Sequence, residues 1–345
     1  MINRDNLLSY PYIPFKDSDD DDGEADQKNG CLPDAKDCNK DVYLRYPLVM
    51  MTDANMISHP DLINGYVTLC HPDLKILEND SSMINDAVVD FYLRVLATDA
   101  HEDLKNKMKV LGSNFYKHLI NSSTPYTDIK RWTKKYNLFE QELIIIPIIM
   151  DNHWSLVVII KPGLLLETTE KSYLLHFDSL QYYHNSSEIC PNLRLFLQRL
   201  ASDNGNNINV DEDTCPCINV TVPQQQGGIV CGLYLIEFVK RVMKQWPLPQ
   251  EINIAYTKVC QSDLYNSYFD NLMASKLRRD ILKVAVKLKP LYDQLKNEEL
   301  IYNTEFGIVE DSYISEGNDL ILILYLKYFQ HKFTNHYCSY LYRYH

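Results

Sequence analysis

The chain has 345 residues, of which 46% are hydrophobic and 23% are charged; this composition is typical of a globular protein and excludes disorder over most of the length. Its formal net charge is −12, from 34 basic and 46 acidic residues, whereas nucleic-acid-binding proteins more often carry a basic excess. We therefore expect no nucleic-acid partner.

Residues 1–40 combine an acidic run, from Asp17 to Asp26, with several prolines and glycines. Such a segment buries too little apolar surface to offset the entropy of ordering, so we expect a disordered acidic tail. The tail contains no continuous apolar signal-peptide core, and no stretch of the chain reaches the roughly 18 apolar residues of a membrane span. We expect a protein of the nucleus or the cytoplasm, with no membrane partner.

Residues 41–300 alternate helical and strand patterns without a long polar linker, which predicts one α+β domain. Apolar residues at helical spacing predict a helix from about Ile84 to Val95. Further on, Thr124 and Pro125 supply an N-cap followed by a first-turn proline. This pair predicts the start of a second helix.

Three short apolar runs rich in β-branched residues follow. They are Leu143–Met150, Ser155–Ile160 and Ser172–Phe177, with Asp151-Asn152 marking a turn between the first two. Their length and composition predict buried strands. Downstream, apolar residues recur at helical spacing from Cys231 onwards and predict a helix that begins there.

The polar segment 201–217 is rich in glycine and asparagine, which predicts a surface loop or insertion. Nine cysteines without regular spacing do not resemble a disulfide framework, so we expect reduced thiols. Cys215 and Cys217 form a close pair, but no second pair accompanies them, and we expect neither a metal site nor a cofactor. Residues 301–345 are a C-terminal extension without an assigned role.

Three residues have the chemistry of a thiol protease. His153 opens a predicted strand, Asp178 follows the next one, and Cys231 begins a predicted helix. An imidazole with a pKa near 6.5 can take the proton of a thiol, and a carboxylate can fix the tautomer of that imidazole. A helix N-terminus also favours the thiolate. Each residue alone equally fits a plain structural role, such as a buried thiol or a turn aspartate.

Gln225 lies six residues before Cys231, in a segment that also contains Gly227 and Gly228. Its side-chain amide and the backbone N–H of Cys231 could both donate to the oxyanion of a tetrahedral intermediate. Glycines at this place let the backbone approach a substrate closely. The segment therefore predicts an oxyanion hole beside the candidate nucleophile.

Five segments, in one order along the chain, carry a resemblance to a known family. They are Arg131-Trp132-Thr133, Ile146-Pro147-Ile148, Asn152-His153-Trp154-Ser155-Leu156, His176-Phe177-Asp178-Ser179-Leu180, and Val222-Pro223-Gln224-Gln225 through Cys231-Gly232-Leu233-Tyr234. From about Tyr43 to about Arg279, the chain resembles the catalytic domain of the ubiquitin-like-protein-specific cysteine proteases, the SUMO (sentrin)-specific protease family. The resemblance implies a papain-like cysteine protease fold of the Ulp type, with a central mixed sheet flanked by helices.

The resemblance also implies roles for single residues. His153 would be the general base, Asp178 its orienting acid, Cys231 the nucleophile and Gln225 the oxyanion donor. Trp154 would cover the Gly-Gly tail of the substrate in a narrow tunnel, although it also fits a core aromatic.

Other matches and departures surround this set. Asn85-Asp86 matches the Asn-Asp near the start of the family domain, and Met83 stands where the family usually has an aromatic residue. Together with Gly228, we expect these residues to contact the substrate. Gly227 and Val230 replace the asparagine and the aspartate that the family usually has, which leaves every catalytic group in place.

The implied function is that of a cysteine isopeptidase, which cleaves after the C-terminal Gly-Gly of SUMO in deconjugation and precursor maturation. We expect a monomer that needs no cofactor and whose partners are SUMO and its conjugates. Two alternatives remain open. One is a protease for ubiquitin or another ubiquitin-like modifier, and the other is a weakly catalytic SUMO-binding module.

Overall fold

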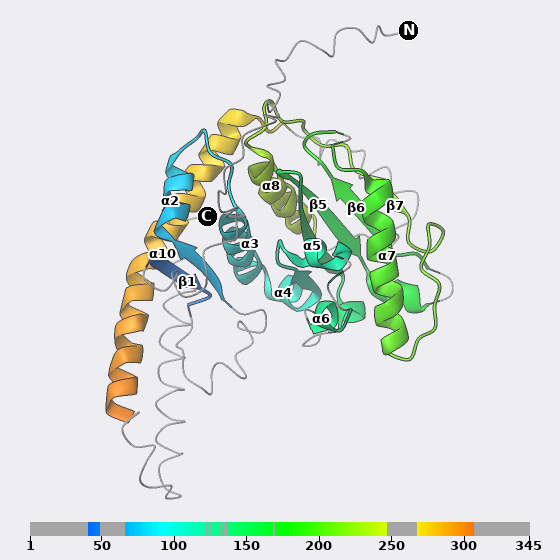
Figure 1. Cartoon of the computed structure of the whole chain (residues 1–345), viewed down its shortest axis with the longest axis horizontal. Helices are drawn as coiled ribbons and strands as arrows, with labels where there is room; N and C mark the ends of the chain where they lie inside the picture. Colours follow the sequence, from blue (N-terminus) through cyan, green and yellow to red (C-terminus); the bar gives the residue numbers. More distant parts are fainter. Residues whose placement is uncertain are drawn as a thin grey trace, which may run out of the picture. The chain divides into compact units, whose positions relative to one another are not determined.

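Strands β4 (Leu143–Met150) and β5 (His153–Ile160) form the centre of a five-stranded sheet in the computed structural model of the chain (Figure 1). They pair antiparallel along their whole length, from Leu143 opposite Ile160 to Met150 opposite His153. Every residue of β5 is buried, because helices cover both faces of the sheet. This explains why both strands are continuous apolar runs instead of alternating patterns.

The structure describes residues 41–48, 66–121, 126–131, 137–167, 170–181, 183–246 and 268–306, together with residues 123 and 133. All of them lie in one unit that begins at Asp41. The predicted tail, residues 1–40, lies outside the described residues, as does residue 307 onwards of the predicted C-terminal extension.

The five strands follow the order β3-β4-β5-β6-β7, so each strand neighbours the next one along the chain. Strands β3 (Met108–Val110) and β7 (Cys217–Asn219) lie at the edges and pair parallel with β4 and with β6 (Tyr173–Phe177), respectively. The inner pairs are antiparallel. The sheet is therefore mixed, as expected for the α+β fold.

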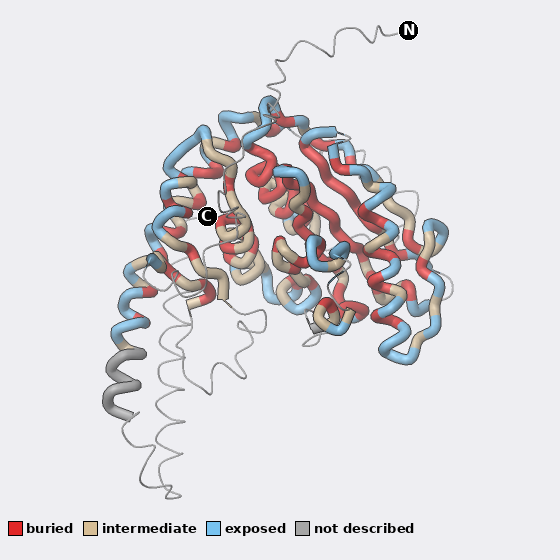
Figure 2. Tube along the Cα trace, in the orientation of Figure 1, coloured by how far each residue is buried: buried red, intermediate tan, exposed pale blue. Residues whose placement is uncertain are grey.

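Two hydrophobic cores lie on opposite faces of the sheet. Figure 2 shows that the central strands of the sheet are buried over most of their length. In β5, Leu156 and Val158 belong to one core and Val157 and Ile159 to the other, as the two-residue period of a strand requires. Helices α3 (Asp86–Asp99) and α8 (Cys231–Lys244) contribute to the first core. Helices α5 (Phe115–Ile120) and α7 (Ser186–Asp203) contribute to the second.

A second, two-stranded sheet extends the first core. It pairs β1 (Val42–Tyr46) with β2 (Val67–Cys70), and it is followed by α2 (His71–Glu78). The long helix α10 (Asn271–Phe306) packs along α2 and β1. Its Arg278 is almost fully buried and donates to the carbonyl oxygens of Ile76 and Ser82, at 2.7 and 2.6 Å. The start of α10 is thereby fixed to the segment before α3.

Short helices complete the described chain. They are α4 (Glu102–Lys107), α6 (Tyr126–Arg131), η4 (Leu138–Glu140) and η5 (Pro162–Leu166). Within the described ranges, no helix is both long and apolar enough to cross a membrane.

The predicted elements agree with the observed ones over most of the domain. The three strands and the helix from Cys231 are confirmed, and the first predicted helix is α3, which begins at Asp86. The second is α6, although its predicted cap, Thr124 and Pro125, lies outside the described residues. Helix α10 continues past residue 300, where we expected the domain to end.

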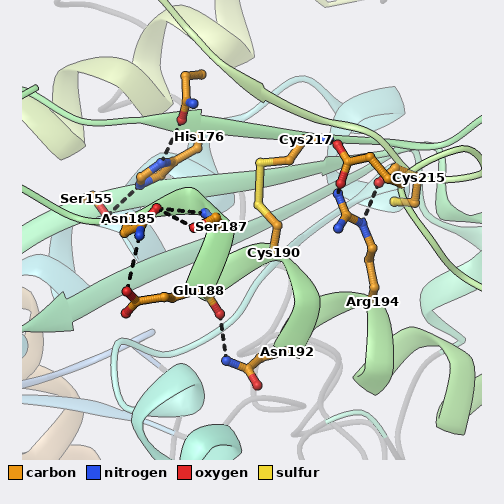
Figure 3. The surroundings of a disulfide bond; sticks show 12 residues. Ser155, His176, Asn185, Ser187, Glu188, Cys190, Asn192, Arg194, Cys215 and Cys217 are labelled. Carbon is orange, nitrogen blue, oxygen red and sulfur yellow. Dashed lines mark hydrogen bonds and ion pairs between the residues drawn. A yellow bond between two sulfur atoms is a disulfide. The ribbon is translucent and has the colours of Figure 1, made fainter. Parts of the chain in front are cut away.

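Segment 201–217 is only in part the loop that we expected. Its first residues end α7 at Asp203, and its last residue begins β7. Between them, Val210 and Cys215 are buried in the second core. Arg194 of α7 donates to the carbonyl oxygen of Cys215 at 2.7 Å and also pairs with Glu212 (Figure 3).

The expectation of reduced thiols is wrong for one pair. Cys190 of α7 and Cys217 of β7 form a disulfide between elements that are packed side by side (Figure 3). Their sequence positions, 27 residues apart, gave no sign of this contact. Cys215 and Cys231 form no disulfide.

Candidate active site

A two-residue turn places His153 at the first position of β5. Asp151 and Asn152 have positive φ angles of 47° and 57°, which is the backbone of a type I′ hairpin. Aspartate and asparagine tolerate this left-handed conformation better than most residues. Because Met150 pairs with His153 across the turn, the imidazole is held at the end of the buried sheet.

Asp178 directly follows β6, and its carboxylate accepts three hydrogen bonds. Oδ1 accepts from His153 Nε2 at 2.6 Å and from the backbone N–H of Leu180 at 2.9 Å, and Oδ2 accepts from the backbone N–H of His184 at 3.0 Å. Burial alone would raise the pKa of Asp178, but these donors and the charge of His153 hold it below the usual aspartate value. Asp178 is therefore a carboxylate at neutral pH.

His153 is the centre of the site. Burial lowers its pKa, but hydrogen bonds and charge interactions with Asp178 and Cys231 outweigh burial and raise that pKa to about 9. Because Nε2 bonds to Asp178, the other ring nitrogen, Nδ1, is available to the thiol. A carboxylate, an imidazole and a thiol thus form one chain of contacts.

Cys231 is the first residue of α8 and is fully buried. Val230, at the N-cap, supplies no side-chain hydrogen bond to the helix. The first-turn N–H groups of a helix have no intrahelical acceptors and carry a partial positive charge, which favours an anion such as a thiolate. The structure thus brings Cys231, His153 and Asp178 together, and their catalytic roles stay a prediction.

Gln225 lies beside the site, held at both ends of its side chain. Its Oε1 accepts from Ser179 Oγ at 2.7 Å, and its Nε2 donates to the carbonyl oxygen of Gly227 at 2.6 Å. An amide nitrogen has two hydrogens, so a second one is available to another acceptor. Gly227 has a φ of +86°, a conformation that asparagine, the usual family residue, adopts less readily than glycine.

The predicted substrate contacts near α3 have structural roles in the folded chain. Asn85 is the N-cap of α3, because its Oδ1 accepts from the backbone N–H of Val88 at 3.1 Å. Its Nδ2 donates to Asp73 at 2.8 Å. Asp86 is a half-buried residue of the first turn, and Met83 is half-buried against the first core. Their contact with a substrate stays a prediction.

Trp154 is almost fully buried. Its side chain is only 1% exposed, and its indole N–H donates to the carbonyl oxygen of Ile84 at 3.2 Å. The even positions of β5 point towards α8, which places this indole in the first core. In this conformation Trp154 packs as a core aromatic, and its contact with the Gly-Gly tail of a substrate stays a prediction. Gly228, in contrast, is exposed with open space around its Cα.

Sequence reasoning missed a group of polar residues behind the candidate triad. His184 Nδ1 lies 2.7 Å from Ser155 Oγ, and His176 Nε2 lies 3.1 Å from the same oxygen. Figure 3 shows the contact of His176 with Ser155. Ser155 and His176 stand inside the segments that carry the family resemblance, but their residue types alone suggested no role. Among the described residues, no cluster of His, Cys, Asp and Glu is arranged to hold a metal ion.

Comparison with known proteins identifies the family. Residues 82–272, more than half of the chain, match the family model described as the Ulp1 protease family, C-terminal catalytic domain. The chain belongs to the Ulp1 protease family. The matched range contains His153, Asp178, Gln225 and Cys231.

Two curated relatives and one solved structure of this family are similar to the chain. The probable ubiquitin-like-specific protease 2A of Arabidopsis thaliana is 27% identical over 238 residues, 64% of this chain and 30% of the relative. Human sentrin-specific protease 2 is 32% identical over 178 residues, 51% of this chain and 28% of the relative. The chain thus matches less than a third of either relative's length.

The solved structure, described as the crystal structure of the de-sumoylating protease, has a TM-score of 0.54 and 23% identity. The match covers 70% of this chain and 93% of that one. The similarity shows that the chain has the Ulp-type fold.

Proposed function

We propose that this chain is a cysteine isopeptidase that cleaves after the C-terminal Gly-Gly of SUMO or a close relative. The observation that carries the proposal is the contact chain from Asp178 through His153 to Cys231, with a distance of 2.6 Å between His153 Nε2 and Asp178 Oδ1. Such a chain activates a thiol, because the imidazolium stabilises the thiolate and the carboxylate stabilises the imidazolium.

In the first step, the Cys231 thiolate attacks the carbonyl carbon of the terminal glycine. The carbonyl oxygen becomes an oxyanion, which accepts from the Cys231 backbone N–H and from the second N–H of Gln225. When the C–N bond breaks, protonated His153 gives its proton to the departing lysine amine. The products of this step are the free lysine side chain and a thioester between the modifier and Cys231.

In the second step, neutral His153 takes a proton from water as the water oxygen attacks the thioester carbonyl. The C–S bond breaks, the modifier leaves with a free carboxylate, and the thiolate is restored beside the imidazolium. Asp178 keeps its charge throughout and only orients and stabilises the imidazole.

The choice of modifier rests on the names of the relatives, a sentrin-specific protease and a ubiquitin-like-specific protease. Gly228 supports a substrate without side chains at its terminus, because its open surroundings allow a backbone to approach closely. Met83 would give the substrate tunnel a wall that adapts to the bound tail, since a thioether side chain is flexible and polarizable. A folded modifier would also need a docking surface of roughly 800 Å² on each partner.

A panel of modifiers, each carrying a thiol trap in place of the terminal carboxylate, tests the proposal. SUMO, ubiquitin and other ubiquitin-like modifiers are incubated with the full chain, and covalent adducts are separated by gel electrophoresis. The expected result is rapid capture of Cys231 by the SUMO probe, with the Cys231→Ala variant as the matched control.

The other outcomes decide between the alternatives. Capture by ubiquitin or another modifier, but not by SUMO, would replace the proposed substrate while keeping the chemistry. Reversible binding of SUMO without an adduct would instead point to a weakly catalytic binding module. Capture that persists in Cys231→Ala would reject Cys231 as the nucleophile.

A further inference from the structure

Two consecutive residues, Tyr183 and His184, hold the candidate catalytic imidazole from two sides. The ring centroids of both residues lie 4.8 Å from that of His153, with interplanar angles of 58° for Tyr183 and 70° for His184. They belong to the loop between Asp178 and α7, so this loop carries both the orienting carboxylate and these two rings.

Tyr183 covers His153 on the solvent side. Tyr183 is 49% exposed, whereas His153 is only 3% exposed. The phenol donates to the carbonyl oxygen of Asp151 at 3.1 Å, which ties the ring to the turn that positions His153. A ring in this place keeps water away from the hydrogen bond between His153 and Asp178. Because a hydrogen bond to a charged group is stronger when water is excluded, the ring strengthens this bond.

His184 supports the same hairpin from the inside. Its backbone N–H donates to Asp178 Oδ2 at 3.0 Å, and its Nε2 lies 3.2 Å from the carbonyl oxygen of Met150. A carbonyl only accepts, so Nε2 carries the hydrogen, and in the neutral ring Nδ1 accepts from Ser155 Oγ. Met150 and Ser155 bracket His153 in sequence, so one buried residue connects Asp178 with both sides of the hairpin.

The polar contacts of His184 and Ser155 continue away from the candidate site to His176 and Asn219. Ser155 Oγ also lies 3.1 Å from His176 Nε2 (Figure 3). His176 Nδ1 donates to the side-chain Oδ1 of Asn219 in β7 at 3.2 Å, because an amide oxygen only accepts. Burial is the largest cause that lowers the pKa values of His176 and His184, so both rings are neutral at neutral pH. Because His184 is neutral, it does not repel a positive charge on the neighbouring His153 imidazole.

We propose that Tyr183 and His184 are positioning residues, which clamp the His153 imidazole against Asp178 and thereby stabilise the imidazolium that activates Cys231. The proposal rests on the proposed function for the roles of the triad, but not on any particular modifier. Four ionisable side chains face His153 besides Tyr183: Asp178, Cys231, His184 and, farther back, His176. Of these, Asp178 alone is a fixed anion.

The test measures the thiol directly. Iodoacetamide alkylation of Cys231 in the full chain is followed by peptide mass spectrometry at pH 6 and at pH 9.5, for the wild type and for Tyr183→Ala, Tyr183→Phe and His184→Ala. The ratio of the two rates reports the thiolate fraction and cancels differences in access to a buried thiol. His101→Ala, at an exposed position on α4's N-cap, is the control.

Loss of the two rings should reduce the pH 6 to pH 9.5 ratio at least about twofold in Tyr183→Ala and in folded His184→Ala, because a thiol without a stabilised imidazolium is more protonated at pH 6. Tyr183→Phe keeps the ring and should keep the wild-type ratio, as should His101→Ala. With a fluorogenic modifier amide, kcat should fall in Tyr183→Ala while KM stays unchanged.

Melting temperatures identify a variant that fails to fold, and the exposed Tyr183 keeps the proposal testable in that case. A wild-type alkylation ratio in Tyr183→Ala would overturn the proposal that Tyr183 positions His153. A chain that shows the expected alkylation but cleaves no modifier would contradict the proposed function and leave the clamp intact. Cleavage of a modifier together with a wild-type alkylation ratio in Tyr183→Ala would support the proposed function and overturn the positioning role of Tyr183.

Discussion

The indole N–H of Trp154 donates a hydrogen bond to the carbonyl oxygen of Ile84, which is 70 residues away in sequence. This bond joins the residue after the candidate base to the segment that contains Met83 and Asn85. Gly232, the residue after Cys231, packs against both partners: a Cβ atom there would lie 2.6 Å from Ile84 Cγ1 and 3.2 Å from Trp154 Cδ1. The glycine after the candidate nucleophile is therefore required by packing.

Gly232→Ala should destabilise the fold by roughly 1–3 kcal/mol, because the added methyl group overpacks a buried site. Urea denaturation measures the loss. Gly228→Ala is the matched control, since a Cβ at Gly228 meets nothing within 4 Å and should leave the free energy of unfolding nearly unchanged. Equal stability of Gly232→Ala and the wild type would show that Ile84 moves aside at little cost.

Gln225→Ala should reduce kcat by roughly 10²-fold to 10³-fold with little change in KM, because an oxyanion donor acts chiefly in the transition state. The neighbouring Gln226 is exposed, and Gln226→Ala is the matched control. Hydrolysis of a fluorogenic modifier amide supplies both constants. A rise in KM at unchanged kcat would assign Gln225 to substrate binding instead.

Activity should fall as the pH rises through about 9, because protonated His153 is the proton donor to the leaving amine and its pKa is raised to about 9. The same shift contributes to stability: the contribution is full below about pH 6.5, the unfolded pKa of histidine, and is lost as the pH rises through 9. The measurement is kcat/KM from pH 7 to pH 10.5. An alkaline limb near pH 6.5 would contradict the raised pKa.

Asn85→Ala should reduce the free energy of unfolding by about 1–2 kcal/mol, because it removes the N-cap of α3 and the bond to Asp73. Asn185, which caps α7 far along the chain, provides a matched control in Asn185→Ala. KM for a modifier substrate, measured for both variants, tests the predicted substrate contact separately, and an unchanged KM in Asn85→Ala would reject that contact. A selective rise in KM for Asn85→Ala would support the predicted substrate contact.

Much of the fold could be predicted because its central elements have strong local patterns. Strands β4 and β5 are apolar runs around an Asp-Asn turn, and α8 has a regular apolar face. Strands β3 and β7 have three residues each, which is too short for a pattern. Helix α7 contains Pro191, a residue that argues against a helix when the sequence is read alone.

The candidate site divides in the same way. Cysteine, histidine and aspartate have chemistry that suggests a role, so His153, Asp178 and Cys231 could be proposed as a set together with the family motifs around them. Tyr183, His184 and Ser155 act through contacts that only the folded chain brings together. The burial of Trp154 depends on the fold as well, because the two-residue period of the strand turns its side chain towards the first core.

The most direct test of the account is the hydrolysis of a fluorogenic C-terminal amide of SUMO by the wild-type chain and by Cys231→Ser. We expect turnover by the wild type and a nearly complete loss in the serine variant, since an alkoxide is much harder to form than a thiolate while the side chains are similar in size. Circular dichroism provides the folding control. Substantial turnover by a folded Cys231→Ser protein would contradict the account, because the nucleophile would then have to lie elsewhere.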